Sequence, residues 1–259
     1  MRLAPLLALA LLAVPVMAQE FPPSTDMKSI PAGEFTMGRQ GSSNHPAHRV
    51  QVSAFELDVH EVTNAQYFAF CQATARKLPA FWNVDRFQCG EAWPDRPVIG
   101  VSLGDARAYA VWVGKRIPTE AEWEWAARGG GEGKYGDDVD ALTIELANYK
   151  KSPHDAPAAV KSYRANGYGL HDMIGNVREW TTDYLSNEVP PASLVPESGD
   201  LAGIVPVIDP TGPDQGPVGV VRGGGWYGGS SCQTVYTRVG YPRAWGDFAV
   251  GFRCAKDVD

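Results

Sequence analysis

The residues best suited to chemistry lie between Gly167 and Trp180, where the chain reads GYGLHDMIGNVREW. Asp172 and Glu179 supply hard carboxylate oxygens on either side of a turn that contains Gly175. Glycine permits positive φ, so the turn can direct the backbone carbonyls of Gly175 and Val177 toward one point. Calcium accepts six to eight such oxygens in a flexible geometry. The same residues also fit a tight turn with solvated acids, so the pattern alone leaves both interpretations open.

The N-terminal residues 1–18 have the features of a cleaved signal peptide. Arg2 supplies the positive charge and Leu6–Val16 the apolar run, followed by a small-residue cleavage site before Gln19. The run is too short to cross a bilayer. We therefore expect a periplasmic or secreted protein with no membrane anchor after cleavage. The remaining residues 19–259 suit one domain, and a monomer is expected.

The composition narrows the class of protein. The net charge is −7 and the basic residues are scattered, so nucleic acid and anionic membranes are disfavoured partners. The chain has 28 glycines, 20 prolines and 8 tryptophans, which favours a loop-rich fold with aromatic cores. Four cysteines in an exported chain first predict two disulfides. They are Cys71, Cys89, Cys232 and Cys254. Proximity favours Cys71–Cys89 and Cys232–Cys254, but spacing does not decide the pairing.

Three helix starts are marked by capping residues. Thr63, Ser102 and Thr119 each precede a run with helical spacing. The predicted helices span residues 64–71, 103–113 and 120–128. Residues 30–38 predict a strand ending in a turn, and the alternation over 48–59 predicts one half-buried strand or two with a bend. Residues 185–219 have no helical period and predict an ordered surface loop or a flap.

Six motifs along the chain resemble the formylglycine-generating enzyme (sulfatase-modifying factor) family in order and spacing. They are IPAGEFTMG at 30–38, EVTN at 61–64, KRIPTEAEWE at 115–124, GNVREW at 175–180, RGGGW at 222–226 and GFRC at 251–254. The resemblance implies an α+β fold, a C-type-lectin-like variant with little regular structure. It also implies a calcium site at Asp172, Gly175, Val177 and Glu179. A possible second calcium site falls on Asn148 and the carbonyl of Tyr149.

The resemblance fails at the catalytic centre. Enzymes of the family oxidise a substrate cysteine to formylglycine with two cysteines that hold Cu(I), since a soft ion prefers soft thiolates. Here the first of these cysteines falls on Gly228, and Cys232 lies one residue short of the second. Cys254 matches a family disulfide cysteine whose partner position is Ala110, which leaves Cys232 as the best available partner. A copper site is therefore disfavoured, and Cys232 is the one candidate catalytic residue.

Two functions remain open. The periplasmic pyoverdine-maturation proteins resemble this chain in export and in lacking the copper pair. They favour an oxidoreductase-type role in the maturation of a periplasmic protein or peptide-like substrate, and this is the interpretation we lean toward. The alternative is a binding module similar to the variable proteins of diversity-generating retroelements, with a ligand surface over 222–253. In either case the predicted surface residues are Arg222, Trp226, Tyr227, Tyr236, Arg238 and Trp245, which suit recognition because large rigid side chains give contact area at low entropic cost.

Overall fold

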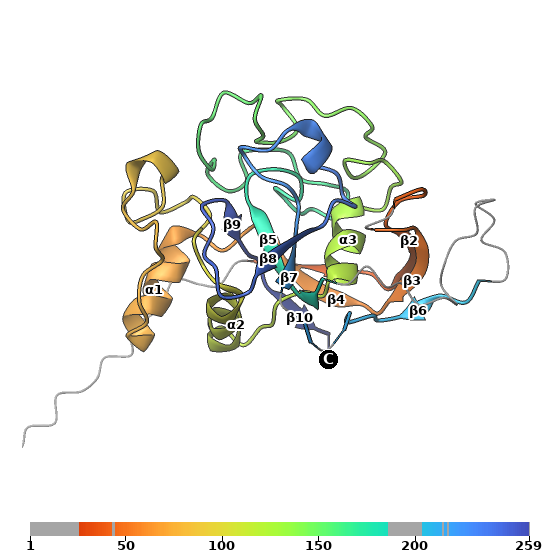
Figure 1. The fold of residues 1–259 in the computed structure, drawn as a ribbon, viewed down its shortest axis with the longest axis horizontal. Helices are drawn as coiled ribbons and strands as arrows, with labels where there is room; N and C mark the ends of the chain where they lie inside the picture. The colour runs from red at the N-terminus through yellow and green to blue at the C-terminus, as the bar shows by residue number, and fades with distance from the viewer. Residues whose placement is uncertain (1–25, 43–44, 186–203, 214, 217, 259) are drawn as a thin grey trace, which may run out of the picture.

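The fold combines three small sheets, three helices and long loops (Figure 1). This computed structural model describes residues 26–42, 45–185, 204–213, 215–216 and 218–258. The predicted signal peptide lies outside the described residues, and so does most of the predicted loop over 185–219. No helix in the part of the chain that is described has both the length and the apolar character needed to cross a membrane.

The central sheet has the strand order β8-β7-β5-β9 and positions most of the residues discussed below. Its strands are β5 (Arg178–Tyr184), β7 (Val218–Arg222), β8 (Val239–Pro242) and β9 (Val250–Gly251). β5 pairs antiparallel with β7 and parallel with β9, and β7 pairs antiparallel with β8. Segments 40 to 70 residues apart in sequence are thereby brought side by side.

Two further sheets of three strands complete the framework. One has the order β1-β4-β10 and contains β1 (Met27–Ile30), β4 (Phe55–Asp58) and β10 (Ala255–Asp257). The other has the order β2-β3-β6 and contains β2 (Gly33–Met37), β3 (His48–Val52) and β6 (Val207–Ile208). The predicted apolar alternation over 48–59 therefore forms two strands, β3 and β4, that lie in different sheets.

The three predicted helix starts are confirmed. The helices are α1 (Asn64–Thr74), α2 (Leu103–Trp112) and α3 (Glu120–Arg128). Thr63, Ser102 and Thr119 each close a capping box with the residue three positions later, which satisfies orphan N–H groups at the helix start. Short 3-10 helices follow at η1 (Asp85–Phe87) and η3 (Ser230–Cys232).

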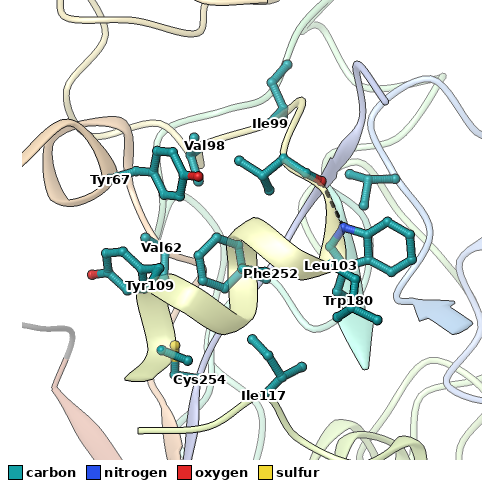
Figure 2. Packing of buried hydrophobic residues seen from close by; sticks show 14 of the residues in the cluster. Val62, Tyr67, Val98, Ile99, Leu103, Tyr109, Ile117, Trp180, Phe252 and Cys254 are labelled. Atoms are coloured by element: carbon teal, nitrogen blue, oxygen red, sulfur yellow. Dashed lines mark hydrogen bonds between the residues drawn. The ribbon is translucent and has the colours of Figure 1, made fainter. Parts of the chain in front are cut away.

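The largest cluster of buried apolar residues among those described lies between α1, α2 and the central sheet (Figure 2). Tyr109 of α2 stacks on Tyr67 of α1 and meets the edge of Phe252. Trp180 of β5 donates its indole N–H to the carbonyl of Val101 at 2.9 Å, so its one polar atom is satisfied in the core. α3 packs separately against β2, β3, β5 and β7, which brings its polar face into contact with the C-terminal strands.

Candidate functional site

The predicted calcium loop lies just before β5 and is buried. Asp172 is 6% exposed, and its Oδ2 accepts a hydrogen bond from the backbone N–H of Lys161 at 2.8 Å. Gly175 has a φ of +81°, and a Cβ there would lie 2.4 Å from the carbonyl oxygen of Asn148, so only glycine fits this turn. Burial raises the pKa of Asp172 from 3.8 to about 6. Burial thus outweighs the local hydrogen bonds that favour the charged carboxylate.

Glu179 is completely buried and joins three parts of the fold. Its Oε2 accepts hydrogen bonds from the indole N–H of Trp123 at 2.7 Å and from Nε of Arg253 at 2.8 Å. Its Oε1 accepts a second bond from the Arg253 guanidinium at 2.8 Å. A carboxylate offers about four lone-pair sites, so Glu179 retains about one more for a further partner.

Glu61 belongs to the same buried cluster, although the sequence had assigned it no role. It is 0% exposed, and its Oε1 accepts a hydrogen bond from Asn176 Nδ2 at 2.9 Å. Its Oε2 is buried without a partner. Burial and then the negative charge of Asp172 raise the pKa of Glu61 well above its ordinary value. The only sequence signal was an acidic residue just before the Thr63 cap.

The oxygen donors of this loop are of the kind that calcium accepts. Three carboxylates, on Glu61, Asp172 and Glu179, share the single guanidinium of Arg253, so the cluster carries more negative than positive charge when ionised. No backbone hydrogen bond among the described residues ends on the carbonyl of Gly175 or Val177. Side chains alone do not complete a site, because the described residues contain no group of three His, Cys, Asp or Glu able to hold a metal. Backbone carbonyls are therefore required, as the sequence predicts.

The possible second calcium site does not fit its residues. The structure brings Asn148 and Tyr149 together, but both oxygens are already engaged. Ser152 Oγ lies 2.5 Å from Asn148 Oδ1 and 2.7 Å from the Tyr149 carbonyl. The hydroxyl lies where the two oxygens converge, and Asp155, the next acid along the sequence, is exposed.

The predicted disulfide between Cys71 and Cys89 is wrong, because both are free cysteines. Cys89 Sγ donates to Asn64 Oδ1 at the start of α1, whereas Cys71 Sγ donates to the Lys77 carbonyl beyond its end. Asn64 and Cys71 are seven residues apart on α1, or roughly 10 Å at 1.5 Å per residue. The two thiols therefore have separate partners along the helix.

The cysteines of the second favoured pair, Cys232 and Cys254, are also free. Cys254 is buried beside α2 in the same cluster as Ala110, and its backbone N–H donates to Asp58 Oδ2 at 2.9 Å. Cys232 is half-buried on η3, in a different part of the C-terminal segment. Burial raises the pKa of Cys254 well above its ordinary value, so this thiol is unreactive. The candidate catalytic residue Cys232 therefore has no second thiol beside it.

Gln233 occupies the space beneath the glycine-rich loop that follows β7. It is 0% exposed, and its Nε2 lies 3.1 Å from the carbonyls of Gly225 and Gly228 and 3.2 Å from that of Gly229. A Cβ on Gly228 would lie 2.8 Å from this nitrogen. Gly228 is the position where the resemblance places the first copper cysteine. The residues here therefore do not fit a two-thiolate copper site.

Two predicted surface residues form ion pairs with α3. Arg222 is 1% exposed, so the prediction of a surface position is wrong for it, and it pairs with Glu120 at 2.7 Å and Glu124 at 2.5 Å. Arg238 is half-buried and pairs with the other oxygen of Glu120 at 2.6 Å. Arg222 and then Arg128 hold the pKa of Glu124 down at about 2 despite its burial. Arg222 and Arg238 attach α3 to the C-terminal segment, because a buried charge must be paired.

The exposed part of the C-terminal segment is a group of aromatic side chains. Tyr227 and Phe248 lie 5.0 Å apart between ring centroids, and Arg178 lies over the Tyr227 ring at 4.9 Å. Trp245 is 61% exposed. We use the name C-terminal surface for three half-buried aromatic residues together with the exposed Trp245; the three are Tyr227, Tyr241 and Phe248.

The two other predicted aromatics lie outside this surface. Trp226 is only 7% exposed and packs beneath Phe248 and Tyr227. Tyr236 packs against the cluster around α3, with Arg39 over its ring at 5.6 Å. Of the six predicted surface positions, Arg222 and Trp226 are therefore buried, and Arg238 is half-buried in an ion pair. The sequence of the segment over 222–253 did not indicate which side chains point inward, because the chain is irregular there.

A family model described as a sulfatase-modifying factor enzyme 1-like domain matches residues 14–258. The formylglycine-generating enzyme of Streptomyces coelicolor is 33% identical over 290 residues, which cover 89% of this chain and 88% of that protein. Two solved structures share the fold. Treponema denticola variable protein 1 has a TM-score of 0.74 and 26% identity, covering 90% of this chain and 95% of that one. PvdO from Pseudomonas aeruginosa has a TM-score of 0.72 and 24% identity, with the same coverage. The predicted α+β fold is thereby confirmed.

Proposed function

Because this chain belongs to the sulfatase-modifying factor enzyme 1-like domain family, we propose that it is an exported, calcium-stabilised protein that binds a protein or peptide-like ligand on its C-terminal surface. The proposal separates the chain from family members that use two cysteines and copper. Fold and family do not determine function, so the proposal depends on the residues at the site.

The observation that carries the proposal is the buried amide of Gln233. It fills the place beneath Gly228 and donates to the carbonyls of the loop. A loop held in this way cannot accept a Cys side chain at residue 228 without displacing the amide. The segment that carries catalysis in the copper enzymes is thus used here as a rigid support for Trp226 and Tyr227.

The C-terminal surface has the composition of a recognition surface. Tyr and Trp supply large, rigid and amphipathic contact area with few rotatable bonds. Tyr227 is held by a hydrogen bond from Arg178 and by its contact with Phe248, so little side-chain freedom is lost when a ligand binds. The 26% identity to Treponema denticola variable protein 1 is consistent with display of side chains from this fold.

In this proposal calcium stabilises the scaffold. The loop that would hold it, with Asp172 and the carbonyls of Gly175 and Val177, leads directly into β5. β5 in turn carries Arg178, which supports Tyr227. A bound divalent cation would neutralise the excess carboxylate charge around Arg253 and fix the start of this strand.

Selection from a random peptide library displayed on phage tests the proposal. We expect the calcium-loaded wild-type chain to enrich binding peptides. The substitutions Trp245→Ala and Tyr227→Ala should each lower the affinity for these peptides at least fivefold. Val111→Ala serves as the control, because Val111 is 75% exposed on α2, away from the C-terminal surface. The proposed surface is wrong if the enriched peptides bind Trp245→Ala and Tyr227→Ala as tightly as they bind the wild type. It is also wrong if the selection enriches no peptide.

Oxidative maturation of a peptide-like substrate is a second candidate, favoured by one observation. Cys232 is a free, half-buried thiol at the edge of the C-terminal segment. A single thiol with a redox metal could support oxidation without the two-cysteine site. Oxygen uptake by the metal-supplemented chain in the presence of a phenolic peptide, abolished by Cys232→Ser, would favour this function over simple binding.

A further inference from the structure

The described arginines differ in whether they have an acidic partner. Five arginines that contact α3, β5 or β10 have carboxylate partners within 2.8 Å; they are Arg116, Arg128, Arg222, Arg238 and Arg253. Arg107 and Arg243 are half-buried and belong to a different group, since neither forms an ion pair with a described carboxylate. In a chain of net charge −7, two neighbouring arginines that have no acidic partner among the described residues require an explanation.

Both guanidinium groups reach the same end of β5. Arg107, on α2, donates to the backbone carbonyl of Thr182 at 3.0 Å. Arg243, which follows β8, donates to the hydroxyl of Tyr184 and lies 4.2 Å from the centroid of that ring. Thr182 and Tyr184 are two residues apart on one strand, or roughly 7 Å. The two positive charges are therefore neighbours, and the charge of Arg107 adds to burial in lowering the pKa of Arg243.

The sheet is built to hold Arg243 in this position. Tyr184, Gly219 and Tyr241 are directly paired across β5, β7 and β8, so they form a row on one face. A Cβ on Gly219 would lie 3.2 Å from Cγ of Arg243, so the missing side chain makes room for the arginine stem. The Arg243 carbonyl accepts a hydrogen bond from Leu103 at the start of α2, which fixes the backbone.

The chemistry of Arg243 is incomplete without an anion. Its Nε is buried and has no hydrogen-bond partner. A buried donor without an acceptor is costly, and so are two like charges held close together. A planar anion would remove both costs, because the guanidinium fork matches a carboxylate. Trp245, two residues further along the same tight turn, supplies apolar contact next to the charge.

We propose that Arg107 and Arg243 bind a carboxylate of the ligand, so that the C-terminal surface selects an acidic peptide. This inference rests on the proposed function and names the ligand class for the same surface. The backbone of the peptide would lie over the aromatic residues, and a Glu or Asp side chain would reach between the two guanidinium groups. The interaction is electrostatic and weakens as the ionic strength rises.

Three pools of synthetic heptapeptides, identical except for a central Glu, Gln or phosphoserine, test the inference. Charge-assisted hydrogen bonds are the strong class, so we expect the Glu pool to bind the wild type about ten- to a hundredfold more tightly than the Gln pool. Arg243→Gln and Arg107→Gln should each remove this preference and leave the affinity for the Gln pool unchanged. Arg49→Gln on β3 is the matched control, because it removes one positive charge from an exposed pair with Glu34.

The outcomes separate the inference from the proposed function. If the Glu and Gln pools bind equally and Trp245→Ala weakens both, the peptide surface stands and the carboxylate site is wrong. Preference for the phosphoserine pool alone would also overturn it. If no pool binds, N-acetylglutamate amide is titrated into ¹⁵N-labelled wild type. An unchanged Arg243 Nε–H resonance then refutes the site, and a shift of that resonance supports it.

Discussion

Replacing Gln233 with Ala should destabilise the fold, because the amide is the main polar contact beneath the glycine-rich loop. Its two N–H groups serve three carbonyls, those of Gly225, Gly228 and Gly229. Each of these carbonyls also accepts a backbone N–H, so the variant loses about two ordinary hydrogen bonds, at about 0.5–1.5 kcal/mol each. The unpartnered Gln233 Oε1 disappears as well, which offsets about 1–3 kcal/mol, so the two hydrogen-bond contributions nearly cancel. The cavity left by the buried side chain then gives a net loss of about 2–4 kcal/mol in the free energy of unfolding.

Thermal and urea unfolding measure this change. For a domain of this size each kcal/mol shifts the melting temperature by about 2–4 °C. The melting temperature of Gln233→Ala should therefore lie roughly 4–16 °C below that of the wild type. Gln233→Glu should be less stable still, since a carboxylate would face three carbonyl oxygens. Gln72→Ala, on an exposed position of α1, should change stability by no more than about 0.5 kcal/mol. A Gln233→Glu variant as stable as the wild type would refute the assigned contacts.

Three further predictions concern cations, thiols and pH. Calcium at a hundred times its dissociation constant should stabilise the chain by about 2.7 kcal/mol, and Asp172→Asn should lose most of that effect in a melting experiment with and without chelator. Thiol titration should find one rapidly reacting group on the native chain, Cys232, and four after denaturation; fewer than four would show that a disulfide forms. Burial, followed by the charge of Glu120, raises the pKa of Asp183 from 3.8 to about 8. The folded chain therefore holds this proton more tightly, and stability should fall as pH rises from about 4 to 8. Asp183→Asn should flatten that slope, and an unchanged slope in urea unfolding would contradict the assignment.

The parts of the fold with local chemical signals were predictable. The three capping boxes depend only on a hydroxyl residue and its partner three positions later, and Thr63, Ser102 and Thr119 all form them. The turn at Gly175 was also predictable, because its tight contact with Asn148 admits no side chain. In both cases the determining interaction lies within a few residues or excludes every other residue type.

The remaining features depend on contacts that are distant in sequence. Arg222 was expected at the surface, but its partners Glu120 and Glu124 lie about 100 residues away on α3. Gln233 has no motif of its own, and its role depends on the path of the loop above it. The predicted disulfides were inferred from the export signal and cysteine count, which carry no information about distance. The irregular segment over 222–253 has no periodicity, so the direction of each side chain could not be deduced.

The central claim is that this family member binds a ligand and lacks two-cysteine copper catalysis. Mass spectrometry of a cysteine-containing peptide tests it most directly, after incubation with Cu(I)-supplemented chain in air. The formylglycine-generating enzyme of Streptomyces coelicolor is the positive control. We predict that the peptide's cysteine remains unmodified with wild type and with Cys232→Ser alike. The account is contradicted if the wild type converts that cysteine to formylglycine and the Cys232→Ser variant does not.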